Sequence, residues 1–162
     1  MGEILIIDDD PFVCESMKEV IYEELPEYQV QYCHTLGEGL NRAESEPYDV
    51  VFLDVLLPDG NGLEALPQIR DGLDTPEVII ITGKGDANGA ELAIKSGAWD
   101  YITKPFTIES LKLPLIRALD YRKEKTRKPT LFLNRENIIG ISPSIKLCLE
   151  KVALSAGSDA GV

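Results

Sequence analysis

The fold of this chain is decided by residues 50–62, which read VVFLDVLLPDGNG. A short apolar run ends in a single carboxylate, Asp54, and a loop rich in proline and glycine follows. Such a run, bounded by turn residues, is typical of a buried strand in a parallel sheet. In open α/β sheets ligands bind beyond the carboxyl ends of the strands, where Asp54 would lie. Because a buried charge is costly without a partner, Asp54 needs one.

The pattern around this stretch alternates strands with helices. Asp10-Pro11 is typical of a helix N-cap followed by proline at the first helical position. Apolar residues at helical spacing then run to Pro26, and comparable patterns follow the later strands. The expected strands are residues 3–7, 28–33, 49–54, 77–82 and 98–102, and the last helix covers about 108–125. Five alternations predict an α/β fold, a doubly wound parallel sheet with helices on both faces and right-handed crossovers.

Proline and glycine mark critical points in the predicted helices. Pro67 lies in the helix after the central loop and is tolerable there if it falls near the first turn. Pro114 lies inside the last helix and should bend or split it. Gly97 is expected to stop the helix before the fifth strand.

Length and composition indicate a soluble globular protein. The 162 residues suffice for one ordinary domain and an appendage. Hydrophobic residues make up 44% of the chain and charged residues 27%, which is ordinary for this class. Three scattered cysteines favour a reduced, cytoplasmic protein over a disulfide scaffold. No apolar stretch approaches the roughly 20 residues of a membrane span, so we expect neither an export signal nor an anchor.

The net charge of −12 is unevenly spread along the chain. Residues 1–120 hold 24 acids and 8 bases, whereas residues 121–162 hold 4 acids and 8 bases. The excess of acids in residues 1–120 argues against direct binding of nucleic acid by these residues. The basic run that starts at Arg122 is interpreted as the solvated end of a helix that leads into a linker, with phosphate contact as the alternative.

Three carboxylates are predicted to converge at one edge of the sheet. Asp8 and Asp9 follow the first strand, and Asp54 ends the third strand. The first and third strands are expected to be neighbours in the sheet. Carboxylates in one crevice repel each other, and a hard divalent cation with oxygen ligands relieves that repulsion. Mg²⁺ fits best, because it uses one or two carboxylates, keeps waters and leaves room for a substrate phosphate.

Further polar groups follow the fourth and fifth strands. Lys104 brings an ammonium on a long stem, Thr82 brings a hydroxyl, and the Gly83 amide is free to point inward. Together with a metal, these groups would form a receptor for a phosphoryl group on Asp54. Asp54 would be the nucleophile and would form an aspartyl phosphate, with charge on the equatorial oxygens absorbed by the metal and Lys104.

These motifs, taken in order, resemble the receiver domain of two-component response regulators. They are ILIIDDDP at 4–11, Asp54 with Pro58 and Gly62, Thr82-Gly83, and Tyr101 with Lys104-Pro105-Phe106. The resemblance covers residues 3 to about 122, so we expect a receiver domain at 1–122. It implies a flavodoxin-like sheet of order 2-1-3-4-5.

The resemblance also implies the chemistry of the site. Asp54 would accept a phosphoryl group from a phosphohistidine on a sensor histidine kinase. Asp8 and Asp9 would hold Mg²⁺ together with Asp54, with Asp9 and the backbone carbonyl of Leu56 as direct ligands. Lys104 would contact the phosphoryl group. The domain would be a regulatory phosphoacceptor that catalyses only its own phosphotransfer and slow dephosphorylation.

A switch is implied by the same resemblance. The hydroxyl of Thr82 would move toward the phosphate while the ring of Tyr101 turns inward. The Lys104–Pro105 peptide bond is expected to be cis. Asp10, the third acid of its run, is assigned to helix capping and not to the metal.

The tail resembles a second family over a short stretch. Residues 137–145, NIIGISPSI, are similar to the opening of the AAA+ module in sigma-54-dependent activators of the nitrogen-regulator type. Residues 123–162 would then be a linker and the truncated start of that module, with ATP hydrolysis and DNA binding outside the chain. Activators of this class resemble dimers, and the apolar stripe of the last helix either packs against its own sheet or extends past it as a dimer seam.

Two other functions stay open beside this interpretation. A degenerate receiver could act only as a protein-interaction scaffold, although the intact acids and Lys104 argue against it. Asp8-Asp9-Asp10 also superficially matches the Asp-x-Asp motif of haloacid-dehalogenase-type phosphatases, but Phe12 stands where their Thr or Val belongs. Of the remaining candidates, His34 is interpreted as a surface residue and Trp99 as a packing residue.

Overall fold

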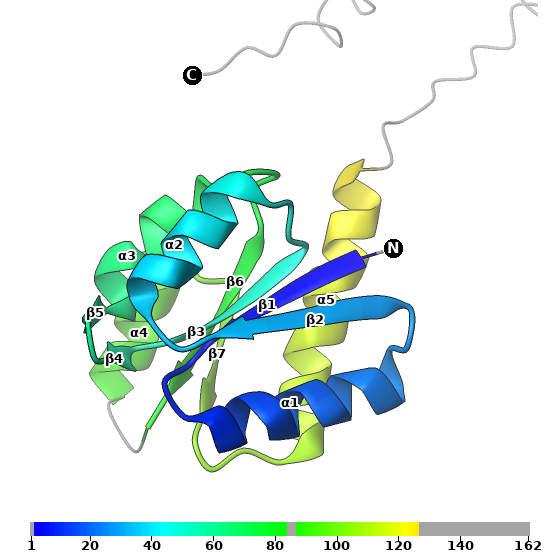
Figure 1. Cartoon of the computed structure of the whole chain (residues 1–162), viewed down its shortest axis with the longest axis horizontal. Coiled ribbons are helices and arrows are strands. Elements are labelled where there is room, and N and C mark those ends of the chain that lie inside the picture. The colour runs from blue at the N-terminus through cyan, green and yellow to red at the C-terminus, as the bar shows by residue number, and fades with distance from the viewer. Residues whose placement is uncertain (1, 84–86, 127–162) are drawn as a thin grey trace, which may run out of the picture. The chain divides into compact units, whose positions relative to one another are not determined.

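The structure is a computed structural model that describes residues 2–83 and 87–126 (Figure 1). The helices are α1 (Pro11–Glu24), α2 (Leu36–Ser45), α3 (Gly62–Arg70), α4 (Ala87–Lys95) and α5 (Ile108–Thr126). The strands are β1 (Gly2–Ile7), β2 (Tyr28–Cys33), β3 (Val50–Asp54), β4 (Leu56–Leu57), β5 (Gly60–Asn61), β6 (Glu77–Thr82) and β7 (Asp100–Thr103). The predicted tail helix lies outside the described residues.

The five longer strands form one parallel sheet in the order β2-β1-β3-β6-β7. Counted along the chain among these five, the order is 2-1-3-4-5, so the predicted doubly wound, flavodoxin-like fold is confirmed. The third strand, expected at 49–54, begins one residue later, at Val50. The fifth, expected at 98–102, covers Asp100–Thr103.

Alternate residues of the central strands face two separate cores. Ile4, Ile6 and Phe52 pack with α1 and α5 on one face, while Leu5 and Leu53 pack with α2, α3 and α4 on the other. Successive side chains of a strand point to opposite faces, so a sheet covered on both sides has strands that are apolar throughout. Figure 1 shows the two layers of helices with the sheet between them.

The helix signals in the sequence act as predicted at two ends. Asp10 is the N-cap of α1, where its side chain accepts a hydrogen bond from the Phe12 amide at 2.9 Å, and Pro11 occupies the first position. Gly97 adopts a φ of 96° just after α4, a conformation that glycine accepts without steric cost.

The two internal prolines do not break their helices. Pro67 lies in the second turn of α3, not near the first, and the helix continues to Arg70. Pro114 was expected to bend or split its helix, and α5 is not split, because it runs unbroken from Ile108 to Thr126. In both helices the neighbouring apolar residues are buried against the sheet, and such packing outweighs a missing hydrogen bond.

A short hairpin was missing from the sequence interpretation. β4 and β5 form an antiparallel pair, in which Leu56 faces Asn61 and Leu57 faces Gly60. The loop after Asp54 is therefore not irregular, because it folds back on itself before α3 begins.

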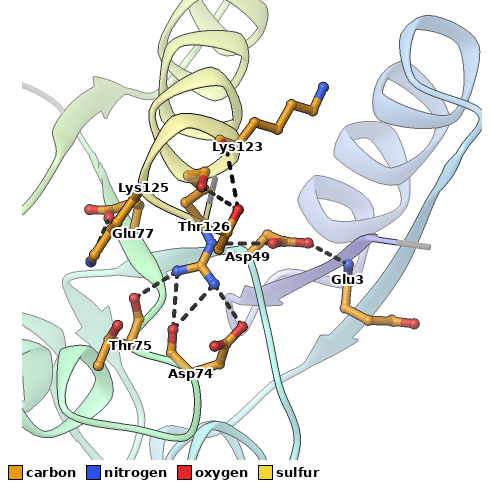
Figure 2. A network of polar contacts seen from close by, with 9 residues as sticks. Glu3, Asp49, Asp74, Thr75, Glu77, Lys123, Lys125 and Thr126 are labelled. Atoms are coloured by element: carbon orange, nitrogen blue, oxygen red, sulfur yellow. Dashed lines mark hydrogen bonds and ion pairs between the residues drawn. The ribbon is translucent and has the colours of Figure 1, made fainter. Parts of the chain in front are cut away.

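The end of α5 carries a buried guanidinium where a solvated helix end was expected. The side chain of Arg122 is almost fully buried, and its Nε lies 3.2 Å from Asp49 Oδ1. Its two Nη atoms donate to Asp74 Oδ2 and the Thr75 carbonyl, each at 2.8 Å. Figure 2 shows the acidic and carbonyl groups that surround this position, with Glu3 bound to Asp49 from β1. Arg122 therefore joins α5 to β3 and to the loop before β6.

Within the described ranges, no helix combines the length and the apolar character that crossing a membrane requires. Cys14 and Cys33 are both buried and free.

Candidate functional site

Three carboxylates meet at the carboxyl ends of β1 and β3, as the sequence predicts. Asp8 follows β1 and is fully buried, Asp54 ends β3 and is 5% exposed, and Asp9 is exposed to solvent. One oxygen from each lies within 4.8 Å of the others. The parallel pairing of β1 with β3 produces this cluster, because neighbouring parallel strands end at the same edge of the sheet.

Lys104 supplies the positive charge that this cluster needs. Its Nζ donates a hydrogen bond to Asp54 Oδ2 at 2.7 Å and lies 2.6 Å from Asp8 Oδ2. The Lys104 amide donates to the carbonyl of Thr82 at 2.7 Å, so the residue is fixed at the end of β6. From there its long stem brings the ammonium to the end of β3.

The charges of this group stabilise one another against the cost of burial. Burial by itself lowers the pKa of Lys104, but Asp54 and Asp8 together raise that pKa above its usual value. Burial raises the pKa of Asp8, and the nearby Lys104 only partly offsets this. Asp8 therefore gains from any additional cation that approaches it.

The backbone beside Asp54 is closely packed. The Leu56 amide donates to Asp54 Oδ1 at 3.2 Å, and the Gly62 amide donates to the carbonyl of Val55 at 2.9 Å. A Cβ atom on Gly62 would lie 2.1 Å from the Asp54 carbonyl oxygen. The glycine eight residues after Asp54 is thus required because α3 begins directly against the backbone of the phosphoacceptor candidate.

Two side chains that the sequence interpretation did not assign to the site bind the backbone of Asp8. Nδ1 of His34 lies 2.9 Å from the Asp8 carbonyl oxygen, and Cys14 Sγ donates to the same oxygen at 3.4 Å. A carbonyl can only accept, so Nδ1 carries the proton in this contact. His34 is half-buried, and its interpretation as a plain surface residue was wrong.

The two residues of the expected switch lie around one small hollow. Thr82 and Tyr101 line it together with Val55, and its volume is about 70 Å³. Thr82 Oγ1 donates to the Gly83 carbonyl at 3.2 Å, and the Tyr101 side chain is 42% exposed. The Lys104–Pro105 peptide bond is cis. Trp99 packs beside Tyr121, with ring centroids 4.9 Å apart, as a packing residue should.

The donor set of the cluster suits a hard divalent cation. Among the described residues, the buried Asp8 Oδ2 has the ion pair with Lys104 Nζ at 2.6 Å and no further polar partner. Asp9 is exposed, and within the described residues Asp8, Asp9 and Asp54 each offer a carboxylate oxygen as a ligand. Mg²⁺ prefers such donors and retains waters on its open side. Asp8, Asp9 and Asp54 therefore fit a magnesium ion.

The family comparison agrees with this geometry. Residues 4–115 match the model of the response regulator receiver domain. Response regulator ArlR from Staphylococcus saprophyticus is 40% identical over 119 residues, which are 74% of this chain and 52% of that protein. The chain thus spans about half the length of the curated relatives it matches.

Two solved structures place the fold among similar domains. The beryllofluoride-activated NtrC4 receiver domain dimer is 31% identical, with a TM-score of 0.69, over 75% of this chain and 98% of that one. NtrX from Brucella abortus, solved in complex with ADP, is 25% identical with a TM-score of 0.70, over 94% of this chain and 34% of that one.

Proposed function

The chain belongs to the response regulator receiver domain family, and from this premise we propose that it is a switch that accepts a phosphoryl group on Asp54. The observation that carries the proposal is the contact of Asp54 Oδ2 with Lys104 Nζ at 2.7 Å, beside the carboxylates of Asp8 and Asp9. A buried nucleophile, a fixed ammonium and an oxygen-rich cation site are the parts that phosphoryl transfer needs.

The donor would be a phosphohistidine of a sensor histidine kinase. A carboxylate oxygen of Asp54 attacks phosphorus, the phosphorus–nitrogen bond breaks, and the electron pair leaves with the imidazole. Lys104 then holds its positive charge beside the new phosphoryl oxygens. Asp8, Asp9, Asp54 and the Leu56 carbonyl would hold Mg²⁺, which supplies charge neutralisation at those oxygens.

Thr82 and Tyr101 would change position when Asp54 is phosphorylated and so alter the surface of the domain. The hydroxyl of Thr82, now bound to the Gly83 carbonyl, would turn to the phosphoryl group. The ring of Tyr101 would then enter the hollow beside Thr82. The surface of β7 changes as a result, and a partner can read that change.

The larger protein would be a sigma-54-dependent activator of the nitrogen-regulator class. Residues 123–162, of which the first four end α5, would form a linker and the start of its AAA+ module. That module would hydrolyse ATP, while a separate domain binds DNA. The similarity to NtrX over 94% of this chain supports this assignment. The receiver would control those domains without enzyme activity beyond its own phosphotransfer and slow dephosphorylation.

The switch would work in the cytoplasm as a homodimer. This fragment would contact neither nucleic acid nor a membrane. The NtrC4 receiver is described as a dimer in its activated form, which supports a dimer here. Two buried free thiols, Cys14 and Cys33, suit a reducing compartment.

Intact-mass measurement tests the proposal. With Mg²⁺ and acetyl phosphate, the wild-type chain should gain one phosphoryl group, and Asp54→Asn should gain none. Asp71→Asn removes an exposed carboxylate far from the cluster in sequence and should behave as wild type. Phosphate gain at the wild-type rate in Asp54→Asn refutes the assignment. No gain in the wild type favours the scaffold alternative, and turnover of a generic phosphate ester favours the phosphatase.

A further inference from the structure

We propose that Asp59 is a positioning residue for the phosphoacceptor, because its carboxylate ties the β4–β5 hairpin to the first turn of α2. The hairpin in turn holds the backbone of Leu56 against Asp54. The inference rests on the proposed function of Asp54, and it adds a residue that lies outside the carboxylate cluster.

Asp59 makes two hydrogen bonds to another element. Its Oδ1 accepts from the Leu36 amide and its Oδ2 accepts from the Gly37 amide, both at 2.8 Å. The first amides of a helix have no partner inside the helix, and they attract negative charge. These two bonds lower the pKa of Asp59, so the carboxylate is charged throughout the neutral range.

The helix α2 does not need Asp59 merely to begin. Thr35 is already its N-cap, and Thr35 Oγ1 accepts from the Glu38 amide at 3.3 Å. Asp59 reaches the two remaining amides from more than 20 residues away in the sequence. The bonds are therefore best understood as a link between two elements.

The β4–β5 hairpin packs closely against the start of α2. A Cβ atom on Gly60 would lie 2.6 Å from Leu36 Cδ2, so a larger residue at this position would have to displace the end of the Leu36 side chain. Leu57 is buried in the same core as Leu36. With only two residue pairs, β4 and β5 form a hairpin that is too short to hold its own shape, so it depends on such attachments.

The other end of the hairpin is attached to the site. The Leu56 amide donates to Asp54 Oδ1 at 3.2 Å, and the preceding Val55 amide donates to the Ile81 carbonyl at 3.1 Å. Leu56 also carries the carbonyl proposed as a magnesium ligand. A displacement at Asp59 would therefore move one hydrogen-bond donor and one metal ligand of the site together.

Loss of the Asp59 carboxylate should slow phosphorylation without removing any reacting group. Groups that orient a metal ligand or a nucleophile typically change affinity or rate by 10–100-fold, and an exposed one belongs at the low end of that range. We expect Asp59→Ala to phosphorylate about tenfold more slowly than wild type at a fixed Mg²⁺ concentration.

The experiment compares Asp59→Ala, Asp59→Asn and Thr35→Ala in the full chain. Intact mass gives the rate of phosphoryl gain from acetyl phosphate, and ¹⁵N NMR gives the amide shift of Leu56 without any donor. Thr35→Ala removes the other cap of α2 and leaves the hairpin bonds in place, so it is the matched control. Asp59→Asn keeps one acceptor oxygen and should fall between Asp59→Ala and wild type in both measurements.

The expected result is a slower rate and a shifted Leu56 amide in Asp59→Ala, with both close to wild type in Thr35→Ala. Equal rates and an unmoved Leu56 amide in Asp59→Ala overturn the proposal, as does an equal rate loss in Thr35→Ala. If the wild-type chain gains no phosphoryl group, the proposed function fails. The Leu56 amide shift then still decides whether Asp59 positions the backbone.

Discussion

At the level of single residues, the ammonium of Lys104 allows two buried carboxylates to share one edge of the sheet. It lies 2.7 Å from Asp54 Oδ2 and 2.6 Å from Asp8 Oδ2. Without it, the two buried carboxylates would repel each other at close range. Removing one partner from a buried ion pair is costly because an uncompensated charge remains.

We predict that Lys104→Met lowers the free energy of unfolding in Mg²⁺-free buffer at pH 7 by about 2 kcal/mol, a value reduced for the partial exposure of Lys104. The loss should shrink at acidic pH, because protonation of Asp8 removes the repulsion. Urea unfolding at both pH values measures this. The control Lys112→Met breaks an exposed pair with Glu24 and should cost at most about 1 kcal/mol. Equal losses in the two variants would contradict the account.

The two buried thiols provide a second prediction. Burial raises the pKa of Cys14 to about 12 and that of Cys33 to about 11, so both stay protonated at pH 8. Since the thiolate is the reactive form, iodoacetamide should leave both unmodified in the folded chain and modify both in urea. Peptide mapping by mass spectrometry checks this. Rapid modification of either residue without denaturant would show that its surroundings are open.

The sequence allowed some contacts of the site to be predicted, but not others. Asp8 and Asp54 were predictable because each ends a strand, and strand ends meet at one edge of a parallel sheet. The contact of His34 with the Asp8 carbonyl and the bonds of Asp59 to α2 depend on the paths of loops. No periodicity encodes those paths, so the contacts became visible only in the structure.

At the level of elements, α5 is fixed to the rest of the domain by its last turns. Arg122 contacts Asp49, which directly precedes β3, and the carbonyls of Asp74 and Thr75. Both loop residues have positive φ, 68° and 47°, which is uncommon outside glycine. The guanidinium satisfies the carbonyls that this conformation turns toward α5.

We predict that Arg122→Met lowers the free energy of unfolding by about 3 kcal/mol, because Asp49 and the loop carbonyls lose their partner. Arg122→Lys should restore little, since one ammonium cannot replace the several donors of a planar guanidinium. Lys123→Met is the neighbouring control, and it should cost less than about 1 kcal/mol because Lys123 is exposed and its Nζ lies 5.9 Å from the centre of the Tyr28 ring. Urea unfolding measures all three. A near-neutral Arg122→Met would show that the buried contacts do not stabilise the domain.

The elements themselves were largely predictable, whereas their irregular parts were not. Apolar runs and capping residues predicted the five long strands and the ends of α1 and α4. Pro67 was expected only near a first turn and Pro114 was expected to bend or split its helix, but the packing of their neighbours against the sheet keeps α3 and α5 continuous. The β4–β5 hairpin has too few residues to show an alternating pattern. The burial of Arg122 was not predicted, because Arg122 lies in a run of basic residues and burial of one of them at a helix end has no sequence signature.

At the level of the whole molecule, charge opposes the dimer that we propose. The chain carries a net charge of −12, so two copies repel each other at low ionic strength. We predict that self-association becomes tighter as NaCl is raised from about 0.05 M to about 0.5 M, since salt screens this repulsion. Sedimentation equilibrium of the phosphorylated and unphosphorylated chain measures it. A monomer in both states at all salt concentrations would exclude the proposed dimer.

The central claim is that the phosphoryl group resides on Asp54. The most direct measurement is reduction of the phosphorylated chain with borohydride, which converts an aspartyl phosphate to homoserine, followed by peptide sequencing. The account predicts homoserine at position 54 and unchanged aspartate at positions 8, 9 and 59. Homoserine at any other position, or none in a chain that has gained phosphate, would contradict it.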